Sequence, residues 1–170
     1  MSARLTIRRA EAADADTVIA LIEALADYEK LTPPGAAARE RLRRDIAEGR
    51  RFSVLLADVG GEAIGYALFF ETYSTFLGLP KLYLEDIFVR PQSRSTGAGL
   101  ALFRAVCREA LARGCGALEW EVLDWNRLAL DFYERLGAKH SRGWLPYRLD
   151  REGMEAVAGE QPAAGDRPGT

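Results

Sequence analysis

The sequence is poor in the residues that metal sites and disulfide frameworks require. It contains one histidine, His140, and two cysteines, Cys107 and Cys115, with no second group of Cys or His around them. A single histidine excludes a multi-histidine metal site, and this cysteine pattern indicates neither a zinc site nor a disulfide framework. We therefore predict no metal, and we expect any chemistry to use carboxylates, phenols, hydroxyls and backbone amides.

The sequence also lacks a long apolar segment and an excess of either charge. Its longest runs without a charged residue, Thr72 to Pro80 among them, are far shorter than the ~20 apolar residues of a membrane-spanning helix. The N-terminus shows no apolar signal segment. The 23 Lys and Arg residues nearly balance the 25 Asp and Glu residues, which provides no basic surface for nucleic acid. We therefore predict a cytoplasmic protein with neither a membrane nor a nucleic-acid partner.

The content of 48% hydrophobic and 28% charged residues is typical of a globular protein with a packed core. Apolar spacing predicts the order β-α-α-β-β-β-α-β-α-β, a mixed sheet flanked by helices in the α/β (α+β) class. The expected strands are Leu5–Arg9, Phe52–Ala57, Ala63–Tyr73, Lys81–Val89, Ala117–Leu123 and Gly143–Leu149. The expected helices are Asp14–Leu31, a segment ending near Gly49, Gly97–Arg113 and Leu128–Leu136. We predict one domain over residues 1–152 and a loosely held C-terminal tail over residues 153–170.

The stretch from Leu82 to Gly99 runs from a strand through a short loop into a helix. The first N–H groups of a helix lack internal partners, and Gly97 and Gly99 remove side chains that would hold a phosphate away from them. A pyrophosphate could bind there. A Walker loop would need a lysine, and the dinucleotide fingerprint would need a third glycine in place of Leu102. The two glycines by themselves also fit a simple capped turn.

Several segments, Arg94-x-x-Gly97-x-Gly99 among them, resemble the GCN5-related N-acetyltransferase (GNAT) superfamily over residues 4 to about 150. The other matching segments are Leu25–Glu29, Leu82–Val89, Trp125–Asn126 and Phe132–Ala138. Within the superfamily, the chain is most similar to diamine (spermidine/spermine) acetyltransferases and thialysine acetyltransferases. The resemblance implies a mostly antiparallel central sheet, acetyl-CoA as cosubstrate, a small-molecule primary amine as acceptor, and a homodimer.

The resemblance also implies a cofactor site. In the family, backbone groups of the strand that matches Ile87, Phe88 and Val89 pair with the pantetheine arm, and the following loop holds the pyrophosphate. That loop consists here of Arg94, Ser95, Thr96, Gly97, Ala98, Gly99 and Leu100. Asn126 would also contact the cofactor. Family members often carry glycine in place of Ser95, and a serine restricts the backbone there.

Glu85 and Tyr133 are the expected catalytic residues. A primary alkylamine with a pKa near ~10.4 is neutral in only about one molecule in 2,500 at pH 7, so its proton must be removed. Glu85 lies in an otherwise apolar strand and could accept that proton directly or through a water. Tyr133 matches the family position beside the sulfur, and its phenol could protonate the departing thiolate. From the residues alone, Glu85 could instead form a structural pair with an Arg or a backbone amide, and Tyr133 could pack the sheet with Phe132.

The resemblance assigns the amine pocket to Tyr28, Glu29, Glu85, Asp86 and Trp144. Asp86 should point to the opposite face from Glu85 in a regular strand, unless a bulge redirects it. Glu29 also fits a solvated charge at a helix end.

Polyamine-acetylating members carry acidic and tryptophan residues in the segment where this chain has Ser74 and Phe76, and an acid where it has Arg142. Losing two anions and gaining a cation should weaken the binding of a multiply charged polyamine. A smaller amine, such as a lysine analogue, is therefore an equal candidate for the substrate.

Two functions follow from these residues. The first is an acetyl-CoA-dependent N-acetyltransferase that acts by direct transfer, because neither Cys107 nor Cys115 matches a catalytic position for an acetyl-enzyme. The alternative is a non-catalytic acyl-CoA-binding module or regulatory subunit. The presence of both Glu85 and Tyr133 favours the enzyme.

Overall fold

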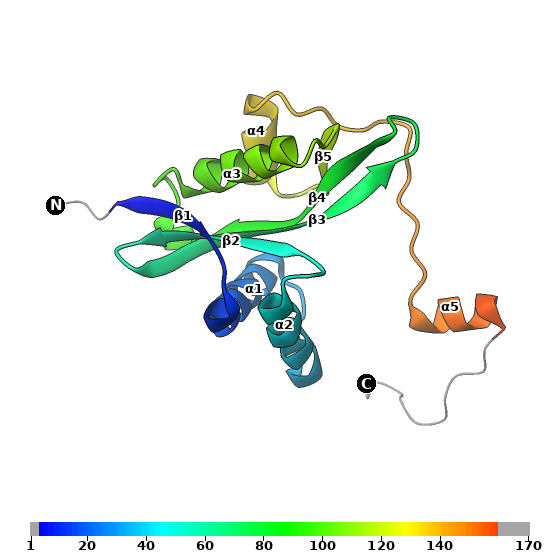
Figure 1. Cartoon of the computed structure of the whole chain (residues 1–170), viewed down its shortest axis with the longest axis horizontal. Helices are drawn as coiled ribbons and strands as arrows, with labels where there is room; N and C mark the ends of the chain where they lie inside the picture. Colours follow the sequence, from blue (N-terminus) through cyan, green and yellow to red (C-terminus); the bar gives the residue numbers. More distant parts are fainter. Residues whose placement is uncertain (1–3, 160–170) are drawn as a thin grey trace. The chain divides into compact units, whose positions relative to one another are not determined.

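The computed structural model describes residues 4–159, which divide into two units, one up to Leu123 and one from Asp124. In the first unit, helices lie on both faces of a five-stranded sheet (Figure 1). Its strands are β1 (Leu5–Arg9), β2 (Ser53–Val59), β3 (Glu62–Ser74), β4 (Leu79–Val89) and β5 (Ala117–Trp120). Its helices are η1 (Ala12–Asp14), α1 (Ala15–Glu29), α2 (Ala36–Glu48), η2 (Pro91–Ser93) and α3 (Ala98–Ala112). The second unit contains α4 (Arg127–Arg135) and α5 (Arg151–Ala158).

The strands are arranged in the order β1-β2-β3-β4-β5. Neighbours from β1 to β4 pair antiparallel, and β5 joins β4 in parallel. The turn between β2 and β3 places Gly60 and Gly61 at φ values of 63° and 87°, as a tight hairpin turn requires. The mixed, mostly antiparallel sheet with helices on both faces confirms the predicted fold class.

The two faces of the sheet bury different sets of apolar side chains. Helices α1 and α2 cover one face and α3 covers the other (Figure 1). The core on the first face consists of Ala15, Val18, Leu21, Ile46, Val54, Leu56, Tyr66, Leu68 and Phe88. The buried side of α3 consists of Ala98, Leu102, Phe103, Val106 and Ala110, at the three- and four-residue spacing of an amphipathic helix. Strands β3 and β4 therefore lie between two packed layers.

The predicted strand over Gly143–Leu149 is wrong. Residues 144–150 have no regular secondary structure, and Trp144, Leu145 and Tyr147 are exposed. Apolar alternation alone does not form a strand, because a strand also needs a neighbour to accept its backbone hydrogen bonds. Helix α5 covers part of the predicted tail, and residues 160–170 of that tail lie outside the described residues. The single domain expected over residues 1–152 spans both units and stays a prediction.

No helix within residues 4–159 has the length and the apolar content needed to cross a membrane.

Candidate active site

Glu85 lies at a β-bulge in β4. Leu84 pairs with Phe69 on β3, whereas Asp86 pairs with the adjacent residue, Leu68. Glu85 is thus an extra residue opposite no partner on β3, and one extra residue reverses the alternation of side chains between the two faces. Asp86 consequently shares a face with Leu68, on the side of the sheet covered by α1 and α2. The bulge redirects Asp86 in the way that the sequence analysis allowed for.

The bulge coincides with the point where β4 and β5 stop pairing. Their last pair is Leu84 with Trp120, where β5 ends. Beyond it, the only strand next to β4 within the described chain is β3. The stretch Ile87–Val89 therefore has one strand edge free of a neighbouring strand. This is the stretch predicted to bind the pantetheine arm through its backbone.

Four carboxylates gather around the bulge: Glu29 at the end of α1, Glu85 and Asp86 on β4, and Glu121 just past β5. None of them forms an ion pair with a described residue. The alternative interpretation was a structural pair of Glu85 with an arginine or a backbone amide, and within residues 4–159 the structure shows neither an ion pair nor a hydrogen bond of this side chain.

Glu29, Glu85 and Asp86 have raised pKa values. The side chain of Glu85 is exposed at the surface, yet its partial burial raises its pKa, and the charges of Asp86 and Glu121 raise it further. Burial likewise raises the pKa of Glu29. A proton acceptor with a raised pKa is well matched to removing a proton from an amine near neutral pH. No group of three or more His, Cys, Asp or Glu residues within residues 4–159 is arranged to hold a metal ion.

Asp86 is held by a buried tyrosine of the neighbouring strand. The Tyr66 hydroxyl donates a hydrogen bond to Oδ2 of Asp86 at 3.0 Å. Burial, followed by the negative charge of Asp86, raises the pKa of Tyr66, so that its hydroxyl stays protonated and acts as a donor. Burial raises the pKa of Asp86, and the hydrogen bond from Tyr66 opposes that rise.

The loop between β4 and α3 contains two residues with left-handed backbone conformation. Ser95 has a φ of 70° and Gly97 a φ of 82°. A residue with a Cβ is strained in this region, so the structure gives a physical reason for a preference for glycine at position 95. Gly97 is the N-cap of α3 and provides no side-chain cap, and the N–H groups of Gly99 and Leu100 form no hydrogen bond with the described residues. The loop thus presents free donors at a helix N-terminus.

A cation–π contact joins the predicted cofactor loop to the predicted amine pocket. The guanidinium of Arg94 lies 4.4 Å from the centroid of the Tyr28 ring, in the last turn of α1. Arg94 Nε also donates to the carbonyl oxygen of Val89 at 3.4 Å. These contacts hold the start of the loop against the end of α1.

The remaining predicted site residues lie in the second unit. Asn126 accepts a hydrogen bond from the N–H of Ala129 at 3.2 Å and is the N-cap of α4. Tyr133 is 9% exposed, and its ring packs edge to face against Phe132 with centroids 5.4 Å apart. Trp144 is 79% exposed. The roles of Asn126 and Tyr133 toward the cofactor, and of Trp144 toward the amine, stay predictions.

Two residues of the site were missed in the sequence analysis, Tyr66 and Glu121. Glu121 could have been found, because it lies two positions after Glu119 within the expected strand Ala117–Leu123, and such residues share a face. Tyr66 offered only a hydroxyl within a strongly apolar strand. Its partner became visible only through the register of β3 and β4.

Comparisons with known proteins show the family to which the chain belongs. The chain matches the Acetyltransferase (GNAT) family over residues 18–138. A thialysine N-epsilon-acetyltransferase from Sus scrofa is 36% identical over 170 residues, which cover 93% of this chain and 99% of that protein. A spermidine/spermine N(1)-acetyltransferase-like protein 1 from Homo sapiens is 28% identical over 166 residues, which cover 91% of this chain and 24% of that protein.

A solved structure supports the fold. The structure of AAC(6')-Iy in complex with the bisubstrate analogue CoA-S-monomethyl-acetylneamine superposes with a TM-score of 0.70 at 22% identity, covering 86% of this chain and 99% of that chain. The family match and the similar relatives lead to one conclusion. The chain belongs to the acetyltransferase (GNAT) family and is an N-acetyltransferase.

Proposed function

We propose that this enzyme transfers the acetyl group of acetyl-CoA directly to a primary amine of a small cationic molecule, with a lysine analogue such as thialysine favoured over a polyamine. The observation that carries this proposal is the carboxylate cluster around the bulge. Asp86 lies close enough to Glu85 to raise its pKa, Glu29 likewise raises the pKa of Asp86, and none of the three has a cationic partner among the described residues. A substrate ammonium group would supply the missing positive charge.

The choice of a lysine analogue rests on two observations. Ser74, Phe76 and Arg142 remove negative charge where polyamine-acetylating members carry it. In addition, the thialysine acetyltransferase of Sus scrofa is 36% identical to this chain, whereas the spermidine/spermine-like protein of Homo sapiens is 28% identical.

The junction of β4 and α3 fits acetyl-CoA. A Cβ added at Gly97 would meet no heavy atom within 4 Å, so the space beside Gly97 is open, and the N–H groups of Gly99 and Leu100 have no hydrogen-bond partner among the described residues. These donors, at the positive end of the α3 dipole, would hold the pyrophosphate. The free edge of Ile87–Val89 would pair with the pantetheine arm. Acetyl-CoA, when bound, supplies the acetyl group as a reactive thioester.

The protein's own groups would move two protons. Glu85 takes the proton from the substrate ammonium group, directly or through a water, and the neutral nitrogen then forms a bond to the acetyl carbon. As the carbon–sulfur bond breaks, the phenol of Tyr133 gives its proton to the thiolate, and the extra proton still on the nitrogen passes through a water to restore the phenol. Backbone N–H groups of Ile87–Val89 would stabilise the negative charge that develops on the thioester oxygen.

The proposal includes a homodimer in the cytoplasm, as the sequence analysis expects. Gel filtration with light scattering tests the assembly, and a monomer over the working concentration range would contradict it.

The function is tested by measuring thiol release from acetyl-CoA with thialysine, lysine, putrescine and spermidine. We expect release with at least one amine, and a higher kcat/KM for thialysine than for spermidine. Calorimetry with acetyl-CoA serves as the companion measurement. Clear binding of acetyl-CoA without release for any amine would support the non-catalytic module instead.

The proton donor is tested by the variant Tyr133→Phe, which we expect to lower kcat by about 10²-fold or more and to change acetyl-CoA affinity less than about twofold. Tyr147→Phe, at an exposed tyrosine of the same unit, is the matched control and should retain kcat. An unchanged kcat in Tyr133→Phe would exclude this residue from the reaction.

A further inference from the structure

We propose that Tyr66 is a positioning residue for the amine substrate: its buried hydroxyl holds one oxygen of Asp86 and leaves the other oxygen to receive the substrate's ammonium group. This inference rests on the proposed acetylation of an amine. It adds to that function a residue whose chemistry acts entirely through Asp86.

The first step is the burial of Tyr66. Its side chain is 0% exposed and belongs to the core between the sheet and helices α1 and α2. A buried phenol needs a hydrogen-bond partner, because an unsatisfied hydroxyl in the core lowers stability. Within residues 4–159, the only hydrogen bond of the Tyr66 hydroxyl goes to Oδ2 of Asp86. Packing in the core thus fixes the position of the Tyr66 hydroxyl, and the hydrogen bond from this hydroxyl fixes the carboxylate of Asp86.

The second step is the unused oxygen of Asp86. The bulge at Glu85 directs Asp86 onto the face of Tyr66, where the side chain is half-buried. Its Oδ1 accepts no hydrogen bond from a described residue, and no ion pair neutralises the carboxylate there. The ionisable groups that influence Asp86 are Tyr66 from β3 and the like-charged Glu29 from α1, and Asp86 in turn influences Glu85, its neighbour on β4. The free oxygen therefore lies among negative charges and attracts a cation.

The third step is the effect of the hydroxyl on the charge of Asp86. Burial and Glu29 both favour the neutral acid, whereas a donated hydrogen bond favours the carboxylate. Phenylalanine would fill the same space in the core but would leave Oδ2 without its donor. Asp86 would then be less often ionised and free to rotate, and it would hold an ammonium group less well. Tyrosine at position 66 thus links a core position to amine affinity.

The test compares Tyr66→Phe with Tyr73→Phe, which removes a hydroxyl from an exposed tyrosine on the same strand. We expect Tyr66→Phe to raise the KM for thialysine about 10-fold, as the loss of a hydrogen bond to a charged group predicts, and to change kcat less than about threefold. Carbon-13 NMR should show a higher pKa of the Asp86 carboxyl in Tyr66→Phe. In an Asp86→Asn background, Tyr66→Phe should raise KM no further.

Other results would overturn the inference. A KM no higher in Tyr66→Phe than in Tyr73→Phe, or a lower Tm with an unchanged KM and Asp86 pKa, would reduce Tyr66 to a packing residue. If the KM increases of Tyr66→Phe and Asp86→Asn multiply in the double variant, Tyr66 acts through a group other than Asp86. If the wild type turns over no amine, the proposed function fails. Calorimetric titration of thialysine then tests positioning alone, and equal affinity of wild type and Tyr66→Phe would overturn it.

Discussion

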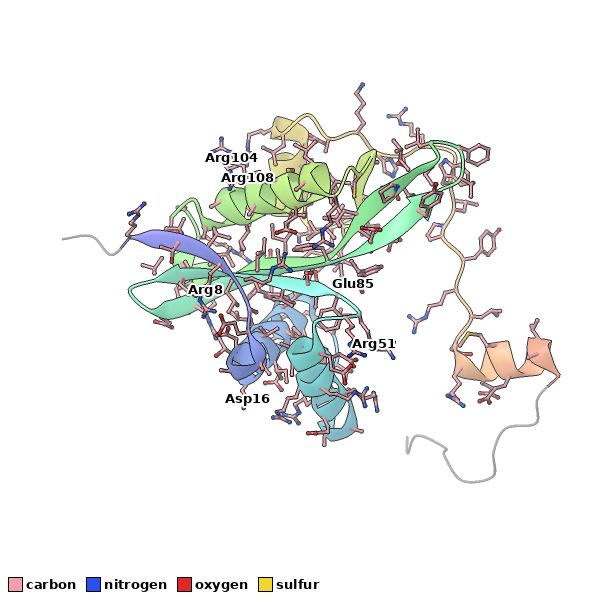
Figure 2. The ribbon with its side chains drawn as sticks, in the orientation of Figure 1. Arg8, Asp16, Arg51, Glu85, Arg104 and Arg108 are labelled. Carbon is pink, nitrogen blue, oxygen red and sulfur yellow. The ribbon has the colours of Figure 1, made fainter. Side chains whose placement is uncertain are left out.

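Acidic side chains at two places in the first unit have opposite surroundings. Beside β1, Arg8 donates to Asp58 at 2.6 Å and to Asp14 at 2.7 and 2.8 Å. These hydrogen bonds hold the pKa of Asp14 down at about 2. At the bulge of β4, Glu85 and Asp86 have no ion-pair partner among residues 4–159, and burial raises both pKa values. Figure 2 shows Arg8 beside β1 and Glu85 beside β4.

Under the proposed function, the difference distinguishes a structural cluster from a functional one. Arg8 forms ion pairs with Asp14 and Asp58, so at this place the chain supplies its own counter-charge and gains stability. Glu85 and Asp86 have no ion-pair partner within residues 4–159, which costs stability, and under the proposed function an incoming ammonium group would remove that cost. Substitutions should therefore affect stability at the first place and activity at the second.

The largest expected effect is that of Glu85→Gln on catalysis. Removing the proton acceptor should lower kcat/KM by about 10²-fold or more without lowering the free energy of unfolding. The matched control is Glu109→Gln, because Glu109 is ion-paired with Arg9 and Arg113. This control should retain its kcat/KM and lose stability. A loss of activity in Glu109→Gln as large as in Glu85→Gln would remove the distinction between the two kinds of carboxylate.

The next effect is that of Arg8→Met on stability. The methionine keeps an apolar stem but leaves Asp14 and Asp58, whose side chains are only 16% and 13% exposed, without their guanidinium donor. We expect the free energy of unfolding in urea to fall by about 1 kcal/mol, since solvent around Arg8 screens part of the interaction. Arg43→Met, at an exposed pair with Asp16, should leave stability unchanged. An unaltered unfolding midpoint in Arg8→Met would contradict a structural role for the cluster.

The two clusters should also respond to pH with opposite signs. Asp14 has a lowered pKa, so its stabilising contribution is present above its ordinary value of 3.8 and is lost as the pH falls towards about 2. Glu85 and Asp86 have raised pKa values, so their ionisation lowers stability as the pH rises through those values. Urea unfolding at a series of pH values should show the stability gap between wild type and Asp14→Asn closing toward low pH.

The same pH series should show Glu85→Gln gaining stability relative to wild type as the pH rises. The acid limb of kcat/KM should lie above the usual range of a glutamate, because Glu85 must be ionised to accept a proton. If the stability differences between wild type and Asp14→Asn and between wild type and Glu85→Gln change with pH in the same direction, the contrast between the two clusters is refuted.

The smallest effect concerns the backbone of the site. Ser95 has a φ of 70°, and glycine would relieve the strain of its Cβ while adding freedom to the unfolded chain. We expect Ser95→Gly to raise the free energy of unfolding by about 0.5 kcal/mol, the net of these two terms. Ser93→Gly, at a neighbouring position without positive φ, should lower stability. A loss of stability in both variants would show that the loop is not strained at Ser95.

Much of the site could be predicted because its residue types are informative where they occur. A glutamate within the apolar strand around Leu84 and Ile87, and glycines at the start of a helix, are visible in one dimension, and both lie where the sequence analysis expected. The strand over Gly143–Leu149 was wrong because alternation describes a side-chain pattern and not the presence of a hydrogen-bonding neighbour. The contact of Arg94 with Tyr28 joins residues 66 positions apart in sequence, and no local pattern predicts it.

By itself, the sequence predicted the order of the strands and helices from β1 to α4, because periodicity and residue type are local properties. Its motifs resembled the acetyltransferase family, which the family match shows. The assignment of Glu85 as the carboxylate that takes the substrate's proton stays a prediction. Only the tertiary structure decided which way Asp86 faces and what holds it. The register of β3 and β4 inserts Glu85 as an unpaired residue, and that single insertion carries Asp86 to the face of Tyr66. Register depends on how two strands pack between two helical layers, and such packing is a property of the whole fold.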